Sequence, residues 1–143
     1  DDPDDRKPNI WKEFKYDDET THPFGKPRTK DKVEFDQQLF NFYKTFIKIR
    51  NENKVLSLGT IEFYPFRDDT DIIIYERKFN NERLIIVGNN SFSKKVIDFS
   101  SIELFKKFNS VKDFVSDKVF DMKKLHNKIK INPYQLMILK TYE

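Results

Sequence analysis

The spacing of the apolar residues changes once along the chain, near Lys54. Before this point apolar residues recur three and four positions apart, and after it they alternate with polar residues in short runs. The first spacing is typical of an amphipathic helix, and the second is typical of strands with one buried face. The chain is therefore expected to contain one helix followed by a mainly β region.

The helix is predicted over residues 32–52. Asp31 stands three residues before Glu34, in the pattern of a capping box, and Asn51 and Asn53 are typical of a helix end. Its apolar stripe is wider than one sheet face can cover, so we expect it to contact two neighbours. The stripe contains Phe35, Leu39, Phe40, Phe42, Tyr43, Phe46, Ile47 and Ile49.

Residues 54–143 are predicted to form an antiparallel β-sandwich. The region holds roughly eight short apolar runs at regular spacing, which is the pattern of such a fold. Leu84-Ile85-Ile86-Val87 has no polar interruption and is predicted to be a central strand, and 134–140 is predicted to be the last strand. Turns are predicted at 80–82 and 88–91.

Composition excludes several classes of protein. Aromatic residues make up 15% of the 143 residues, which is too much apolar bulk for a disordered chain. There is no cysteine, so disulfides, thiolate zinc sites and cysteine nucleophiles are excluded. No run approaches the about 20 apolar residues of a transmembrane helix, so no membrane partner is expected. The net charge of +3 comes without a basic run, so no nucleic-acid partner is expected either.

The first 32 residues combine prolines with charged side chains and are predicted to be an extended loop that lines something. Within it, Asp2 and Arg6 can face each other across a turn, where a carboxylate and a forked guanidinium suit vicinal sugar hydroxyls. From spacing alone, a solvated run of charges is the favoured interpretation. The loop's aromatic rings either stack on a sugar or anchor the loop to a core. They are Trp11, Phe14, Tyr16, His22 and Phe24.

No catalytic motif can be assigned from spacing. The sequence shows no Ser-His-Asp arrangement, no phosphate-binding glycine loop and no convincing pair of catalytic carboxylates. His22 and His126 lie far apart without acidic residues at ligand spacing, so no metal site is predicted. The chain opens on Asp1 rather than Met, and we expect it to be a piece of a longer protein.

Four segments together resemble the C-terminal end of an α-amylase-family glycoside hydrolase, close to the neopullulanase and cyclomaltodextrinase group. Residues 2–11 are similar to that group's Asp-Pro-Asp-x-Arg-x-Pro-Met-x-Trp segment, with Asn9 at the position of Met. Residues 39–50 resemble the eighth barrel helix, and 85–91 and 133–139 resemble strands of the C-terminal β domain. The order and spacing of these segments fit over nearly the full length.

The resemblance implies a division at residue 53. Residues 1–53 would be the end of a (β/α)8 barrel, namely the loop after strand 8 and helix 8, and 54–143 a C-terminal all-β domain of Greek-key type. The family cleaves α-glucosidic bonds by a retaining mechanism with two carboxylates, which lie on earlier barrel strands. No catalytic residue is therefore expected in this chain, which should be inactive alone. Asp2 and Arg6 would contact a sugar on the non-reducing side of the cleaved bond.

The resemblance also implies partners. The longer protein would bind α-glucan oligosaccharides such as starch, pullulan or cyclodextrins. No cofactor is expected in this chain, and the resemblance leaves room for calcium in the longer protein. Without a barrel, the stripe at 35–49 would face water, so self-association is expected. The alternative is a stand-alone carbohydrate-binding or structural β-sandwich module. Localisation stays open between the periplasm and the cytoplasm of a bacterium.

Overall fold

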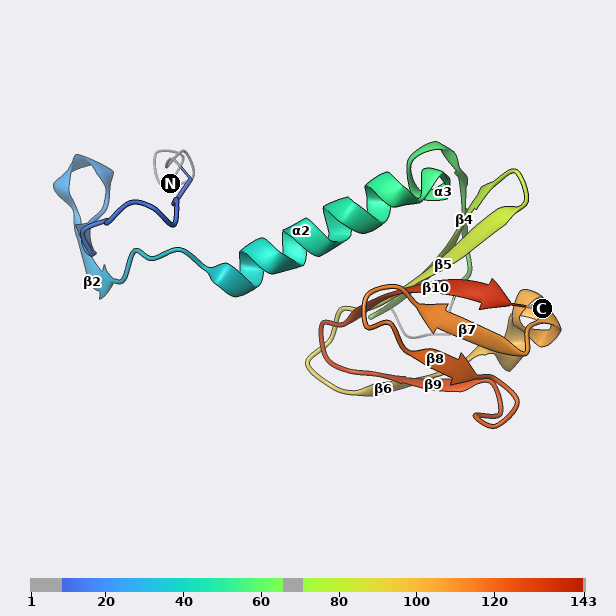
Figure 1. The fold of residues 1–143 in the computed structure, drawn as a ribbon. Helices are drawn as coiled ribbons and strands as arrows, with labels where there is room; N and C mark the ends of the chain where they lie inside the picture. The colour runs from blue at the N-terminus through green and yellow to red at the C-terminus, as the bar shows by residue number, and fades with distance from the viewer. Residues whose placement is uncertain (1–8, 66–70, 143) are drawn as a thin grey trace. The chain divides into compact units, whose positions relative to one another are not determined.

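The computed structural model describes residues 9–65 and 71–142 (Figure 1). The described residues form two compact units, one ending at Tyr43 and the other starting at Lys44. This division falls inside a helix, whose first turns belong to the first unit and whose last turns belong to the second. The predicted boundary between 1–53 and 54–143 stays a prediction.

The first unit contains a β-hairpin where the sequence predicted an extended loop. Strand β1 (Glu19–Thr21) pairs antiparallel with β2 (Pro27–Asp31), and the short 3-10 helix η1 (Pro23–Gly25) forms the turn between them. Gly25 has a φ of 79°, a conformation that glycine adopts without steric cost. The strands escaped prediction because their residues are polar and mostly exposed, so no apolar alternation marks them.

Helix α2 (Gln37–Glu52) begins later than predicted. The carboxylate of Asp36 accepts hydrogen bonds from the backbone N–H groups of Gln38 (2.8 Å) and Leu39 (2.9 Å) and so caps the first turn. The predicted cap at Asp31 is wrong because that residue ends strand β2. Asp31 and Glu34 have the spacing of a capping box, but no helix begins between them.

The end of α2 agrees with the prediction, but the region predicted to be all-β from residue 54 begins with a second helix. The side-chain amide of Asn53 donates to the carbonyl oxygen of Ile49 (2.7 Å), and α3 (Lys54–Leu58) begins at the next residue. Gly59 ends α3 by donating its N–H to the carbonyl oxygen of Val55 (3.1 Å). Val55 is fully buried on this helix, so its apolar character serves helix packing and not a strand.

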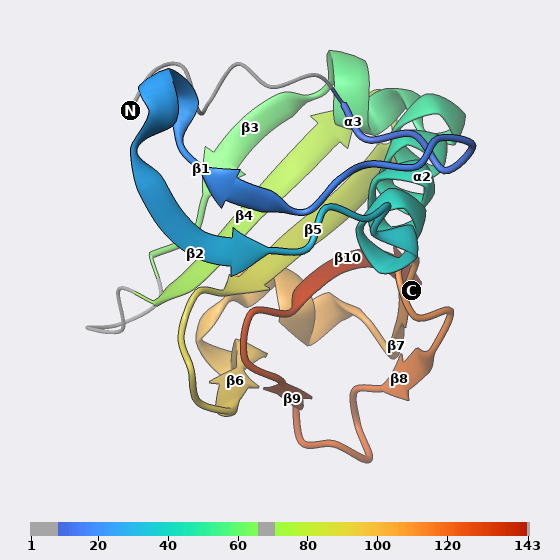
Figure 2. The same ribbon diagram turned by 90° about the vertical axis from the view of Figure 1, so that its left-hand side faces the viewer.

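The second unit is built on two antiparallel sheets. Six strands form one sheet in the order β3-β4-β5-β10-β7-β8, and two strands, β6 and β9, form the other. In Figure 2, β4, β5 and β10 lie side by side at the middle of the larger sheet. The strands are β3 (Thr60–Phe63), β4 (Ile72–Phe79), β5 (Glu82–Asn89), β6 (Lys95–Asp98), β7 (Ser110–Asp113), β8 (Val119–Asp121), β9 (Lys128–Ile131) and β10 (Leu136–Tyr142).

The main core lies between these two sheets. It combines Ile74 and Ile85 from the larger sheet with Ile97 and Ile131 from the smaller one, all at 1% exposure or less. Two short 3-10 helices, η2 (Phe99–Ser101) and η3 (Glu103–Lys107), carry further apolar side chains into it. The predicted mainly β, antiparallel sandwich is therefore confirmed.

A second core covers the opposite face of the larger sheet. Ile49 from the last turns of α2 and Val55 from α3 pack there against Leu84, Ile86 and Ile138. Strand β5 thus has a core on both faces, which explains its uninterrupted apolar run and confirms the prediction of a central strand. One side of the predicted helix stripe therefore contacts the β region, as expected.

One predicted turn and the start of one predicted strand need correction. Gly88 belongs to strand β5, so the turn predicted at 88–91 begins only after Asn89. Tyr134 precedes strand β10, which begins at Leu136, so it lies in the turn after β9. The turn predicted at 80–82 is present at 80–81, and Glu82 already belongs to β5, where it pairs with Phe79 at the end of β4.

Candidate functional site

The two predicted sugar-contacting residues, Asp2 and Arg6, lie outside the described residues. The described part of the same segment presents aromatic rings to solvent. Trp11 is 57% and Phe14 is 66% exposed, and the backbone N–H of Trp11 donates to the hydroxyl of Tyr16 (2.8 Å). The hydrogen bond gives this turn a local structure without burying either ring. These rings are therefore available for stacking.

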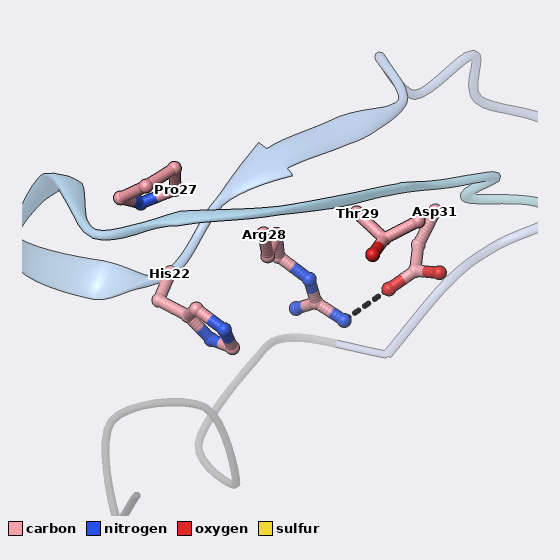
Figure 3. A pocket seen from close by; sticks show the side chains of 5 residues that line it. All are labelled: His22, Pro27, Arg28, Thr29 and Asp31. Atoms are coloured by element: carbon pink, nitrogen blue, oxygen red, sulfur yellow. Dashed lines mark hydrogen bonds and ion pairs between the residues drawn. The ribbon is translucent and has the colours of Figure 1, made fainter.

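The hairpin of the first unit holds a cavity of about 610 Å³. In Figure 3 the Arg28 side chain lies between the imidazole of His22 and the carboxylate of Asp31. Pro27 and Thr29 complete the lining. The pairing of β1 with β2 brings these residues together, because the turn places His22 close to the start of β2.

Arg28 is held by two carboxylates. One nitrogen of its guanidinium contacts Glu19 (3.2 Å) and the other contacts Asp31, and Glu19 and Asp31 are register partners across the hairpin. The Arg28 side chain is 23% exposed, so these pairs are only partly screened by water. Beside them, Lys30 pairs with Asp18 at 2.9 Å. The hairpin therefore offers fixed donors and acceptors, the chemistry that suits a ligand rich in hydroxyl groups.

A buried polar cluster in the second unit was missed by sequence reasoning. Glu76, on β4, is only 4% exposed. Its carboxylate accepts a hydrogen bond from the Tyr64 hydroxyl (2.7 Å) and forms an ion pair with Arg83 (3.0 Å). Burial, followed by the hydrogen bond to Glu76, raises the pKa of Tyr64 above its ordinary value. Glu76 is a charged residue in a strand where apolar and polar residues alternate. From the sequence alone such a position is expected to face solvent. Its contacts indicate a structural role.

A second cavity of about 490 Å³ lies beside the last turns of α2. Its charged residues Lys48, Glu52 and Asp117 have side chains between 61% and 83% exposed, so they remain hydrated. Within 9–65 and 71–142, no group of three or more His, Asp or Glu side chains is placed to hold a metal ion. Over the same residues, no helix is both long and apolar enough to cross a membrane.

Comparison with known families gives one domain match. Residues 60–140, more than half of the chain, match the model of the cyclo-malto-dextrinase C-terminal domain. This range begins with β3 and ends within β10, so it coincides with the two sheets of the second unit.

Known proteins extend the similarity beyond the sandwich. The chain is 27% identical over 139 residues to a cyclomaltodextrinase from Thermoanaerobacter pseudethanolicus, an alignment that covers 97% of this chain. It is 32% identical over 60 residues to a cyclomaltodextrinase from Bacillus sp., which covers 42% of this chain. The chain spans only 19% and 11% of the lengths of these two relatives.

Solved structures share the fold at lower identity. A crystal structure of AmyP in complex with maltose superposes with a TM-score of 0.62 at 15% identity, covering 76% of this chain and 22% of that one. A trehalose-6-phosphate hydrolase from Bacillus licheniformis has a TM-score of 0.60 at 17% identity and covers 84% of this chain and 23% of its own.

Proposed function

Because the chain belongs to the cyclomaltodextrinase C-terminal domain family, we propose that it is the end of a glycoside hydrolase that cleaves α-glucosidic bonds in cyclodextrins, starch or pullulan. The reaction would follow the retaining mechanism, in which one carboxylate attacks the sugar and a carboxylic acid protonates the leaving oxygen. Both groups would belong to barrel strands that precede this chain. The chain itself would contribute binding and stability, and would be inactive alone.

The alignment with the Thermoanaerobacter cyclomaltodextrinase is the observation that carries this proposal. It covers 97% of the chain, so it includes the hairpin and α2 as well as the sandwich. An independent sandwich module would account for the match at residues 60–140 alone. The similarity also covers the residues before position 60. This favours a C-terminal part of a hydrolase in which residues 1–53 complete a catalytic barrel.

We further propose that residues 1–53 help to position the substrate. Asp2 and Arg6 would contact a sugar on the non-reducing side of the cleaved bond. The hairpin around Arg28 supports this assignment, because it adds a guanidinium, an imidazole and carboxylates to the same segment. Such groups hold sugar hydroxyls through directional hydrogen bonds. Binding energy from this remote subsite would serve to orient and distort the reacting sugar.

The exposed side of α2 would pack against the preceding barrel in the complete enzyme. Four apolar side chains on this helix are about half exposed, from 49% to 56%, and Tyr43 is 59% exposed. Such a dense apolar surface is typical of an interface. In the isolated chain we propose that a second copy covers it. The apolar side chains are Leu39, Phe40, Phe42 and Ile47.

Release of reducing sugar from β-cyclodextrin, starch and pullulan tests the proposal. We expect none from the 143-residue chain and turnover by a longer protein that ends in this chain. In that protein, Asp2→Ala and Arg6→Ala should each lower kcat/KM for long glucans, which corresponds to a loss of about 2–4 kcal/mol of transition-state stabilisation, because the remaining charge would lose its partner. Short substrates that leave this subsite empty should be affected less.

Lys7→Ala is the matched control, because Lys7 occupies a variable position of the same sequence pattern. This variant should leave kcat/KM unchanged for both long and short substrates. Hydrolysis by the chain alone would contradict the assignment of catalysis to a preceding segment. Unchanged kinetics of the Asp2 and Arg6 variants on long glucans would contradict their role in binding.

A further inference from the structure

Two exposed aromatic rings meet at one end of the sandwich. Phe92 lies in the turn between β5 and β6, and Tyr134 lies in the turn between β9 and β10. Their ring centroids are 5.2 Å apart and their planes stand at 84°. Phe92 is 89% exposed and Tyr134 is 57% exposed. The yellow and red turns that carry them lie side by side in both views of the ribbon (Figures 1 and 2).

A buried asparagine holds the two turns together. The side-chain amide of Asn89 donates to the carbonyl oxygens of Ser93 (2.8 Å) and Asn132 (2.9 Å), one in each turn. Its side-chain oxygen accepts from the N–H (3.1 Å) and the hydroxyl (2.7 Å) of Ser91. Asn89 is 3% exposed and its hydrogen-bonding capacity is used in full. The position of the rings therefore depends on this polar residue and not on burial of the rings.

Neither ring contributes much to folding stability. At these exposures both side chains keep most of their apolar surface in water, so they gain little hydrophobic free energy. Tyr134 also has a φ of 52°, in the left-handed region that residues other than glycine and asparagine rarely adopt. An aromatic side chain that is exposed and held in an unfavourable conformation points to contact with a ligand.

We propose that Phe92 and Tyr134 form a non-catalytic binding platform for the sugar rings of an α-glucan. In a perpendicular pair, the ring that presents its edge keeps both of its faces clear of the other ring. An aromatic face carries negative charge density and attracts polarised C–H groups, which a sugar ring presents on its flat sides. The same turns also carry exposed polar residues that are close in sequence to the two rings and can hydrogen-bond to sugar hydroxyls. These residues are Asn90, Ser93 and Asn132.

The size of the surface favours a sugar over a protein partner. Two aromatic side chains offer at most about 500 Å² of contact area. A stable protein interface covers about 800 Å² on each partner. One or two sugar units match the smaller area. The choice of an α-glucan as the sugar rests on the proposed function.

Calorimetric titration of the 143-residue chain with maltoheptaose tests the platform. We expect saturable binding that Phe92→Ala and Tyr134→Asn each weaken by about tenfold, the loss expected for one stacked ring. Asparagine is chosen because it tolerates a positive φ, so the turn keeps its backbone conformation. Phe63→Ala is the matched control. Phe63 is a 67% exposed phenylalanine that also contacts a tyrosine ring, Tyr75, on the same sandwich.

The outcomes separate this inference from the proposed function. Absence of maltoheptaose binding, or equal weakening in the Phe63 variant, would overturn the platform and leave the catalytic proposal intact. Binding of β-linked cellohexaose with equal affinity would overturn its assignment to α-glucans. Conversely, a longer protein without hydrolytic activity would contradict the proposed function, even if maltoheptaose still bound at Phe92 and Tyr134.

Discussion

The fully buried carboxylate of Asp113 accepts a hydrogen bond from the backbone N–H of Ile138 on the neighbouring strand (3.0 Å). The same oxygen accepts from the N–H of Val115 (3.1 Å), and the second oxygen accepts from the N–H (3.2 Å) and hydroxyl (2.6 Å) of Ser116. One carboxylate thus joins the end of β7, the turn after it and β10. Four donors compensate the cost of burying its charge.

Replacement of Asp113 by asparagine should therefore destabilise the sandwich. The new amide has a single acceptor oxygen, and its NH₂ group would face backbone donors, so at least one buried donor loses its partner. We expect the free energy of unfolding, measured in urea, to fall by about 2–3 kcal/mol. Asp117→Asn is the control, since Asp117 is 83% exposed and pairs with Lys112 at the surface, and loss of this pair should cost less than about 1 kcal/mol. Equal losses of unfolding free energy in the two variants would show that the hydrogen bonds of Asp113 do not stabilise the fold more than a surface ion pair does.

Gly59 is required at the end of α3 because there is no room for a side chain. A Cβ at this position would lie 2.4 Å from the carbonyl oxygen of Val55 and 3.0 Å from that of Lys78. We expect Gly59→Ala to lower the free energy of unfolding by about 1–3 kcal/mol, because backbone atoms must move. At Gly88 a Cβ would meet only the side chain of Leu136, at 3.6 Å, so Gly88→Ala should be tolerated. Similar urea midpoints of unfolding for the Gly59→Ala variant and the unmodified chain would contradict this account.

The acid stability of the turn after β6 should depend on Asp98. Hydrogen bonds from the hydroxyl and the N–H of Ser100, with a smaller contribution from Lys128, lower the pKa of Asp98 below its ordinary value. A group whose pKa is lowered by folding stabilises the fold above its unfolded pKa, and this stabilisation is lost as pH falls through the folded pKa. Its loss is therefore expected in the acid range, below the ordinary pKa of 3.8.

Ser100→Ala should raise the pKa of Asp98 more than Lys128→Met does, as measured by following the Asp98 carboxyl carbon by NMR against pH. The hydroxyl is the largest cause of the shift, whereas the Lys128 ammonium lies 3.6 Å from a carboxylate that is 44% exposed. Water and salt weaken such a pair. A larger effect of the lysine variant would mean that charge, and not the hydrogen bond, sets the pKa of Asp98.

Sequence reasoning succeeded where burial and periodicity coincide. The mainly β fold and the central strand at 84–87 follow from apolar runs that the structure places between two cores. The resemblance to an α-amylase-family hydrolase, close to the cyclomaltodextrinases, is confirmed by the family match. These features depend on many residues, so a single misleading position does not change them.

The errors occur where one side chain decides the local structure. The start of α2 depends on the Asp36 carboxylate, and a capping-box pattern five residues earlier carried the same signal without forming the cap. Tyr134 was predicted to lie on a strand because aromatic residues favour strands, whereas its turn is held by a hydrogen bond from Asn89 to Asn132, distant in sequence. The sugar contacts of Asp2 and Arg6 stay predictions, because they lie outside the described residues.

The exposed face of α2 carries the last prediction. Leu39, Tyr43 and Ile47 are spaced four residues apart on this helix, and each is between 53% and 59% exposed. Covering such side chains with a second copy would contribute about 1.5–3 kcal/mol for each one fully buried. We therefore expect the isolated chain to self-associate in sedimentation velocity experiments, with a mean mass that rises with concentration.

Tyr43→Lys with Ile47→Lys should shift the chain toward monomer, because a charge cannot be buried unpaired in an apolar contact. Phe63→Lys is the matched control, since Phe63 is similarly exposed but lies on β3. It should leave the concentration dependence unchanged. A monomer at all concentrations would show that the α2 face does not need covering in this chain. Loss of association in the Phe63 variant alone would place the contact on the edge of the larger sheet instead.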